Sequence, residues 1–367
     1  MSSTDLDLRG TLDGVRASAA RGDRSAVARL VIFILAIALA VAGMFSLGSG
    51  ATDSSALAVT WALITGDDSA ITLVERIVIL DIRAPRTVLG IIVGASLAVS
   101  GAIMQGLFRN PLADPGIVGV SAGAGLGASS FIVLGSGVLA PISAFFGIYD
   151  VPFAAFIGGL VTTFLLYRVS TQNGRTSVAT MLLAGIALGA LTNAFTGLLV
   201  FWADDNQLRD LNFWGLGSVA GATWLKFWAV APIILPIIIL APMMAKGLNA
   251  MTLGEATAHH LGVNVQVFKR IAIVAVAAST GAAVAVTGGI GFVGIVVPHL
   301  LRLLIGPDHR YLLPACALLG GIMLLFADAI ARQIVAPAEL PIGIVTATIG
   351  APFFLWILLK RRGILDM

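Results

Sequence analysis

The hexapeptide at 289–294, GIGFVG, matches the GxGxxG string that binds dinucleotides in other proteins. A dinucleotide site needs a strand before this string and a helix after it, whereas here long apolar segments lie on both sides. The other phosphate-binding pattern, GxxxxGK(S/T), does not occur in the chain. If ATP drives the function of this protein, another subunit must therefore bind the nucleotide.

Metal, redox and nucleic-acid chemistry find little support in the sequence. The four histidines, His259, His260, His299 and His309, belong to no HExxH or spaced Cys/His pattern, so no metal site is expected. The single cysteine, Cys316, lies in an apolar run, which excludes a disulfide framework. No basic stripe is interleaved with aromatic residues, so nucleic acid is not an expected partner.

An acid and three arginines are the next candidates for chemistry. Asp328 is the most embedded acid, and Arg332 lies four residues later on the same helical face, so we expect the two to pair near the outer membrane surface. A proton relay is the alternative, but it would need several such acids. Arg83 and Arg86, on either side of a proline suited to a first helical turn, can both point outward. They could anchor the helix by snorkelling or, with Arg332, form a landing site for an acidic partner.

The polar segment 249–270, NAMTLGEATAHHLGVNVQVFKR, interrupts two long apolar stretches. It predicts a short helix outside the bilayer, with Thr252 and Glu255 as a capping box and Gly262 as the stop. A helix of about nine residues is only ~14 Å long, too short to cross a membrane and well suited to a partner's groove. An ordinary solvated loop is the alternative.

A second polar segment, NPLADP at 110–115, ends an apolar stretch. Two prolines four residues apart forbid a continuous helix and predict a shaped turn at the inner membrane face. A gate could sit there, although proline turns between helices are common.

The elements that position these residues must be membrane helices. Of the 367 residues, 58% are hydrophobic and only 11% are charged, whereas soluble domains have about 25% charged residues. We predict an all-α polytopic membrane protein with about ten spans, of which the third and eighth are the least certain because they are glycine-rich or broken by proline. The predicted spans lie near 30–49, 87–107, 117–135, 152–169, 178–202, 226–245, 268–287, 292–306, 311–331 and 342–359.

The distribution of cations predicts the orientation. With the N-terminus inside, 16 of the 22 lysines and arginines lie on the inner side and 6 on the outer side, which is the bias expected of the cytoplasmic face. Ten spans return the C-terminus to the cytoplasm, and segment 249–270 is then cytoplasmic. Residues 1–29 are predicted to be a cytoplasmic tail and 30–362 the transmembrane domain, with no cleaved signal peptide.

Six motifs taken together resemble a known family. They occur in the right order and spacing and are RAPR (83–86), NPLADPGIVGVSAGAG (110–125), LLAGIALG (182–189), GEATAHHLG (254–262), GGIGFVGIVVPHLLR (288–302) and LPIGIVTATIGAPFF (340–354). They are similar to the permease subunits of type II ABC importers for iron–siderophores, haem and cobalamin, over about residues 60–362.

The resemblance implies a homodimer with its path at the two-fold axis, two cytoplasmic ATPase subunits that bind ATP and Mg²⁺, and an outer substrate-binding protein. It implies no catalytic residue, metal or cofactor on this chain. The implied binding-protein contacts are Arg83, Arg86 and Arg332. The implied ATPase-coupling residues are Thr252, Leu253, Gly254, Glu255, Ala258, Leu261 and Gly262. The implied cytoplasmic gate is Asn110, Leu112, Val178 and Leu182, although Val178 departs from the threonine of the cobalamin transporter.

Three further stretches, at 213–224, 306–314 and 334–347, look most like haem-uptake permeases, and a path lined by small and apolar residues suits a flat, partly apolar ligand. We therefore expect a haem-importing permease in the bacterial inner membrane. The alternatives are a ferric-siderophore or cobalamin importer and, in another class, an ion-coupled secondary transporter. A membrane-embedded enzyme ranks last because no catalytic pair is visible.

Overall fold

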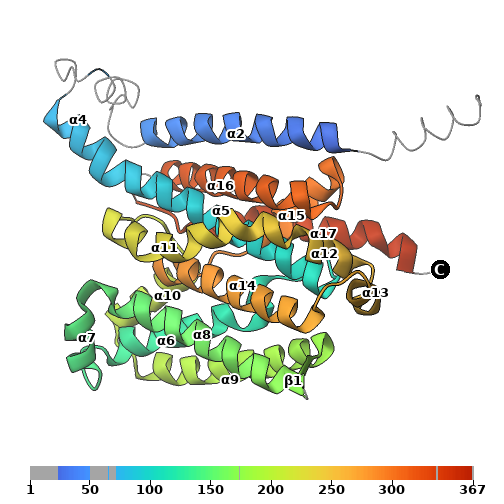
Figure 1. The fold of residues 1–367 in the computed structure, drawn as a ribbon. Coiled ribbons are helices and arrows are strands. Elements are labelled where there is room, and N and C mark those ends of the chain that lie inside the picture. Colours follow the sequence, from blue (N-terminus) through green and yellow to red (C-terminus); the bar gives the residue numbers. More distant parts are fainter. Residues whose placement is uncertain (1–23, 50–64, 66–71, 173, 336–337, 366–367) are drawn as a thin grey trace, which may run out of the picture.

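The computed structural model describes residues 24–49, 65, 72–172, 174–335 and 338–365, and these form a bundle of helices with roughly aligned axes (Figure 1). Ten helices correspond to the ten predicted spans. They are α2 (Ser25–Gly48), α5 (Ala84–Phe108), α6 (Val120–Leu134), α8 (Asp150–Ser170), α9 (Val178–Trp202), α11 (Trp224–Leu240), α14 (Val265–Thr287), α15 (Val293–Ile305), α16 (His309–Ile334) and α17 (Ile342–Leu365).

Short elements join these helices. They are α4 (Leu73–Ile77), the π-helix η2 (Val78–Arg83), η3 (Pro115–Val118), α7 (Ala140–Phe146), η4 (Gly147–Tyr149), β1 (Thr171–Gln172), β2 (Arg175–Thr176), α10 (Asp205–Leu216), η5 (Ala241–Met244), α12 (Ala245–Thr252) and α13 (Glu255–His260). The two strands form one antiparallel hairpin between α8 and α9, in which Thr171 pairs with Thr176.

By length and hydropathy, seven continuous helical stretches among the described residues could cross a membrane, and α6, α15 and the Ile342–Trp356 part of α17 add three shorter apolar helices. The two spans predicted with least certainty, 117–135 and 292–306, are both among these short helices. The polytopic all-α fold is thus confirmed. The first span begins at Ser25, inside the predicted tail 1–29, and the part of that tail at 1–23 lies outside the described residues.

The second span starts earlier than predicted. It runs without interruption from Leu73 through α4, η2 and α5 to Phe108. A capping box of Thr72 and Glu75 starts it, and Pro85 follows directly after the π-helix rather than opening the span. A π-helical turn accommodates a proline that would otherwise clash with the preceding turn.

Helix α5 is the centre of the bundle. Nearly every residue from Leu89 to Phe108 is buried, against α16, α14, α15 and α11. A Cβ atom at Gly94 would lie 2.2 Å from the carbonyl oxygen of Gly320 on α16, so glycine is needed for this close approach. A Cβ atom at Gly90, four residues earlier on α5, would lie 3.3 Å from the Leu325 side chain of the same neighbouring helix.

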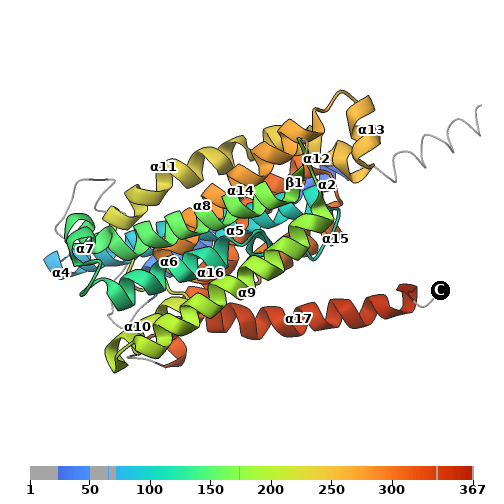
Figure 2. The ribbon, with the colours of Figure 1, turned by 90° about the horizontal axis from the view of Figure 1, so that it is seen from below.

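The outer helices expose their apolar side chains. On α9, for example, Leu183, Ile186 and Phe201 are 70%, 72% and 82% exposed. In a membrane such a surface faces lipid or another apolar helix surface rather than water. Figure 2 shows α9 and α17 running along the same side of the bundle.

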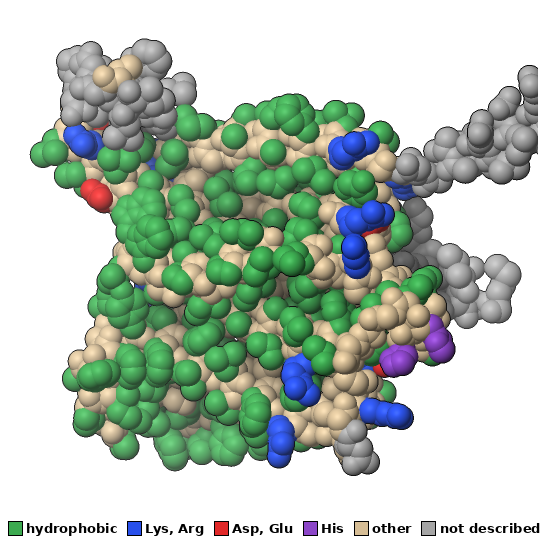
Figure 3. Space-filling model, in the orientation of Figure 1, with side chains coloured by type: hydrophobic (Ala, Val, Ile, Leu, Met, Phe, Trp, Pro, Cys, Tyr) green, Lys and Arg blue, Asp and Glu red, His purple; other side chains and the backbone are tan. Residues whose placement is uncertain are grey.

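The two ends of the bundle differ in charge. The start of α2 lies beside the end of α15, where Arg24 donates to the Leu303 carbonyl at 3.4 Å, and the end of α17 lies at the same end as α12 and α13 (Figure 1). On the face in Figure 3, most lysine, arginine and histidine side chains gather at this end. On this face the cations of the described residues are therefore concentrated at one end of the bundle.

Candidate functional site

The arginine cluster, which we define as Arg83, Arg86 and Arg332 with Asp328 and Glu339, lies at the end of the bundle that carries α4. Arg86 donates to both carboxylate oxygens of Asp328, with a shortest distance of 2.8 Å, and to Glu339 at 2.7 Å. Arg332 approaches the same Asp328 carboxylate at 3.1 Å. The predicted pair within α16 is confirmed, and it is part of a larger network between α5 and α16.

The prediction that Arg83 and Arg86 point outward is wrong, since they are only 5% and 8% exposed. Arg83 donates to the Leu47 and Gly48 carbonyls at the end of α2, at 2.9 and 3.1 Å. The three-residue spacing does place both arginines on one face. That face lies against α2 and α16, because a buried carboxylate such as Asp328 needs cations around it.

The polar segment between η5 and α14 folds as two short helices, α12 and α13, rather than one. The predicted capping box is wrong, because Thr252 is the last residue of α12 and donates to the Asn249 carbonyl at 2.6 Å. The helical conformation is interrupted at Gly254, whose φ of +104° favours glycine. Helix α13 then runs for six residues from Glu255. Gly262, with φ +85°, follows α13 as the predicted stop.

The surface of this coupling segment (residues 252–262) carries two exposed apolar side chains. Leu253 and Leu261 are 65% and 62% exposed, whereas Ala258 is fully buried and holds α13 against its neighbours. His259 and His260 are also exposed at this end. Large apolar side chains that protrude from a charged, polar end are typical of a protein–protein contact.

Helix α12 is tied to the start of α16. The Asn249 amide donates to Asp308 at 2.7 Å, and its oxygen accepts from the backbone of His309 at 3.0 Å. Asp308 also caps α16 by accepting the Arg310 N–H at 3.0 Å. Burial raises the pKa of the Asp308 carboxyl, but hydrogen bonds from Arg310 and Asn249 outweigh it and leave the pKa below its ordinary value.

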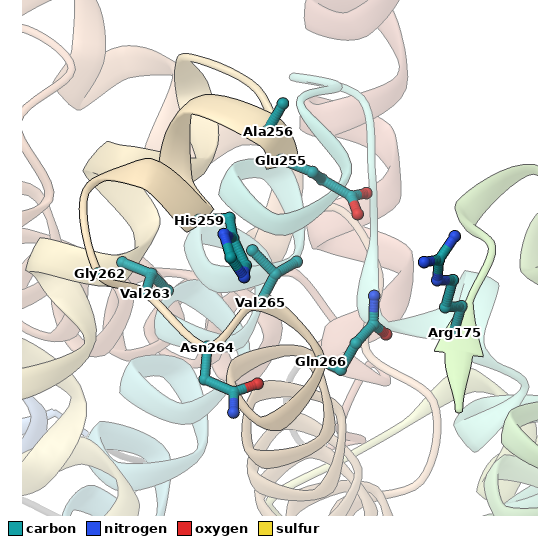
Figure 4. Close-up of a pocket in the computed structure, with 9 residues that line it drawn as sticks. All are labelled: Arg175, Glu255, Ala256, His259, Gly262, Val263, Asn264, Val265 and Gln266. Atoms are coloured by element: carbon teal, nitrogen blue, oxygen red, sulfur yellow. The ribbon is translucent and has the colours of Figure 1, made fainter. Parts of the chain in front are cut away.

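A groove lies between α13, the first turn of α14 and the hairpin (Figure 4), with a volume of about 820 Å³. Its lining residues are Arg175, Glu255, Ala256, His259, Gly262, Val263, Asn264, Val265 and Gln266. In Figure 4, Glu255 of α13 and Gln266 of α14 extend toward the side of the groove bordered by Arg175 of β2. The coupling segment and the hairpin that leads into α9 thus line the same groove.

The predicted gate turn follows α5. Arg109 ends that helix in the left-handed region at φ +51°, and the Asn110 side chain accepts the Leu112 N–H at 3.0 Å, which forms the shaped turn predicted from the two prolines. Asp114 caps η3 by accepting the Gly116 N–H at 2.7 Å. Burial raises the pKa of the Asp114 carboxyl, and this hydrogen bond only partly offsets the effect.

The other two predicted gate residues lie at the start of α9. Ser177 caps this helix by accepting the Thr180 N–H at 3.3 Å, and Val178 and Leu182 occupy its first two turns, both half-buried. Helix α9 packs against η3, directly after the Asn110–Asp114 turn. The fold therefore packs η3, which follows the first predicted gate segment, against the helix that carries the second.

Sequence reasoning missed three residues that join these regions. Lys269 and Gln266 on α14 bind the backbone of Thr176 in the hairpin, and Lys269 also pairs with Glu255. From the sequence, Lys269 is only one of the cations predicted to be cytoplasmic. The available signal was its position, with Arg270, at the start of a long apolar helix, since a lysine there must find partners.

The GIGFVG string lies in surroundings unlike those of a dinucleotide site. The GIGFVG string at 289–294 joins α14 to α15, so a helix precedes it instead of a strand. Within the described ranges no three His, Cys, Asp or Glu side chains gather as metal ligands would.

Comparison with known proteins gives consistent similarities over most of the chain. The sequence pattern of the FecCD transport family matches residues 32–360. The hemin transport system permease protein HmuU of Yersinia pestis is 48% identical over 283 residues, which is 77% of this chain and 83% of that protein. The vitamin B12 import system permease protein BtuC of Klebsiella pneumoniae is 43% identical over 288 residues, 78% of this chain and 84% of that protein.

A solved structure shares the arrangement of helices. It is described as an inward-facing conformation of a metal-chelate type ABC transporter, and it is 31% identical with a TM-score of 0.78 over 90% of this chain and 99% of that one.

Proposed function

The chain belongs to the FecCD transport family, as a permease subunit of a type II ABC importer, and from this premise we propose that it moves haem from the outer side of the bacterial inner membrane into the cytoplasm. The ATPase of such importers is a separate subunit, in keeping with the missing phosphate-binding pattern. The chain itself is a membrane transport component and not an enzyme.

One observation carries the choice of haem, namely the higher identity to the hemin permease, 48%, than to the vitamin B12 permease, 43%. The fifth and tenth spans, α9 and α17, would line the path, and their apolar side chains suit a large, flat, partly apolar ligand. The chain's histidines lie in α13, in α15 and at the start of α16. Haem would thus pass by shape and apolar contact, without histidine ligation near the outer mouth.

We further propose that the coupling segment is where a cytoplasmic ATPase subunit binds, once on each chain of a homodimer. The exposed Leu253 and Leu261 would enter the ATPase, and the groove beside Glu255 would receive part of it. Asn110, Leu112, Val178 and Leu182 would form the inner gate, since η3, directly after the first pair, packs against α9, which carries the second pair.

Docking of a substrate-binding protein at the arginine cluster also remains our proposal, in a modified form. Arg83 and Arg86 are buried and the Arg332 side chain is 9% exposed, but Glu339, which pairs with Arg86, has a side chain that is 40% exposed. A carboxylate of the binding protein would therefore reach Arg86 by displacing Glu339, rather than by meeting freely exposed arginines.

The test of function is a reconstituted importer. The chain, its ATPase and its binding protein are placed in proteoliposomes, and ATP turnover and uptake are measured with haem, a ferric siderophore and cobalamin in parallel. Haem should stimulate turnover and accumulate inside. If only cobalamin or only the siderophore stimulates ATP turnover, that ligand and not haem is the substrate. Uptake without any ATPase would show that the chain is an ion-coupled carrier and not an ABC importer subunit.

A further inference from the structure

Lys269 occupies an unusual position for a lysine. It lies in the second turn of α14 and is only 2% exposed, which makes it one of the largest fully buried side chains among the described residues. Its ammonium group donates to the Glu255 carboxylate at 2.7 Å and to the Thr176 carbonyl at 2.9 Å. A buried ammonium is costly unless charged and polar partners satisfy it, so both contacts are strongly favoured.

The two contacts join different parts of the molecule. Glu255 is the first residue of α13, in the coupling segment, and its negative charge there is favoured by the helix dipole. Thr176 ends β2 and comes two residues before Val178, where α9 begins. Lys269 therefore links the surface proposed to bind the ATPase with the helix proposed to form the gate.

A second side chain of α14 completes the link. The Gln266 amide oxygen accepts the Thr176 N–H at 3.0 Å, so both backbone groups of Thr176 are held by α14. Gln266 and Lys269 are three residues apart and lie on the same face of the helix. Arg270 adds a hydrogen bond to Tyr167 at 3.2 Å, in the last turn of the helix α8 that leads into the hairpin.

We infer that Lys269 is a positioning residue that transmits movement of α13 to the start of α9, and thereby couples ATP-driven motion to the inner gate. This inference rests on the proposed binding of the ATPase to the coupling segment. Glu255 is 38% exposed and lines the groove, so a partner in the groove would act directly on one end of the link. The hydrogen bonds to Thr176 carry that displacement into the first turn of α9.

The experiment uses the complete importer in proteoliposomes, with haem as the transported probe, and compares three variants. Lys269→Met removes both contacts while keeping an unbranched side chain. Glu255→Ala breaks only the α13 end, at a partly exposed position where folding is less affected. Glu255→Gln keeps an oxygen acceptor for Lys269. We expect uptake per ATP hydrolysed to fall by about five- to a hundredfold in the first two, the range of typical coupling strengths, and by much less in Glu255→Gln.

A second readout does not depend on the ligand. Hydrogen–deuterium exchange is measured with and without ATP trapped by vanadate. In the wild type, trapping should change exchange at 254–262 and at 176–182, whereas in Lys269→Met and Glu255→Ala only 254–262 should respond. The matched control is Lys246→Met, which removes an exposed lysine of α12 and should leave both segments and the uptake ratio as in the wild type.

The outcomes separate this inference from the proposed function. A wild type in which trapped nucleotide leaves 254–262 unchanged would show that the coupling segment does not bind the ATPase. A wild type that responds, together with a Lys269→Met variant that keeps the response at 176–182 and the normal uptake ratio, would overturn the role of Lys269 alone.

Discussion

At the scale of single residues, the arginine cluster has a structural duty that its motif did not reveal. Arg86 and Arg332 share the carboxylate of Asp328, and these side chains are 9%, 9% and 2% exposed. Removal of one partner from a buried pair is far more harmful than loss of an exposed pair, because the remaining charge is left without compensation. The RAPR motif therefore holds α5 against α16, whatever it contributes to docking.

This reasoning gives the first prediction. Arg86→Ala should lower the free energy of unfolding by about 3–5 kcal/mol, since it leaves Asp328 with one cation fewer in a buried site. Thermal unfolding of the purified protein in detergent measures the effect. The control is Arg209→Ala, whose pair with Asp210 is 3.9 Å long and largely exposed, and which should cost at most about 1 kcal/mol. Equal melting temperatures for the two variants would contradict the structural role.

The second prediction concerns the stability of the protein at low pH. Because the pKa of Asp308 is lowered in the folded protein, its contribution to stability is complete above the ordinary pKa of 3.8 and is lost as the pH falls through the folded value. Asp308→Asn keeps an oxygen to cap α16 but no longer titrates. The loss of melting temperature between pH 6 and about pH 3 should be smaller in this variant than in the wild type, and identical losses would refute the assignment.

At the scale of elements, the coupling segment shows how a glycine decides where helices end. Thr252 and Glu255 fit a capping-box pattern, yet the positive φ of Gly254 ends α12 and lets α13 start with Glu255. The side chain of Glu255 therefore does not form a capping box and instead binds Lys269. A contact with a residue fourteen positions away on another helix thus takes the place of the predicted local one.

Helix α13 gives the third prediction. Ala258→Pro should disrupt α13, because proline removes the N–H that Ala258 donates to Gly254 and cannot continue a helix interior, a cost of about 3 kcal/mol or more. The reconstituted importer should still hydrolyse ATP but lose coupled uptake. Lys246→Ala, an exposed change on the neighbouring helix α12 and outside the coupling segment, serves as the control and should transport nearly normally. Full uptake by Ala258→Pro would remove α13 from the coupling route.

The exposed leucines give the fourth prediction. Leu253→Ser together with Leu261→Ser should weaken binding of the ATPase subunit by about a hundredfold or more. Each leucine side chain that becomes buried on binding contributes about 1.5–3 kcal/mol to the binding free energy. Affinity is measured between the purified subunits in detergent. Val138→Ser, a change at the opposite end where the side chain is 84% exposed, should leave the affinity unaltered.

At the scale of the whole molecule, the helix termini and the charged segments are divided between the two ends of the bundle. The start of α2, the end of α17 and the coupling segment lie together, and the arginine cluster lies at the other end (Figure 1). A central, fully packed α5 and apolar outer helices fit a chain that sits among lipids and other helices. The motor and the ligand-delivering protein would thus act at opposite ends of one bundle.

The fifth prediction belongs to this scale. The chain reconstituted alone should take up no haem under a proton or sodium gradient, because Asp328 is the one buried acid among the described residues and is held by two arginines. Addition of the ATPase and binding protein with ATP should restore uptake. Gradient-driven uptake by the chain alone is the contradictory result.

Much of the fold could be predicted from the sequence because its causes are local. Ten apolar stretches became ten helices, since burial in a membrane demands internally bonded backbone. Asp328 and Arg332 pair because helical periodicity places residues four apart side by side. The turn at Asn110 follows from prolines that no helix can continue through. These features need no knowledge of which helix is the neighbour.

Only the tertiary structure decided which distant residues meet. Arg86 and Asp328 are 242 positions apart, and Lys269 and Thr176 are 93 apart. The sequence shows that arginines share a helix face, but whether that face meets lipid, water or another helix depends on packing, here on contacts such as Gly94 with Gly320. Because of packing, the arginines that were predicted to point outward are buried between helices. Packing also places a buried lysine, Lys269, in contact with both the coupling segment and the hairpin that leads into α9.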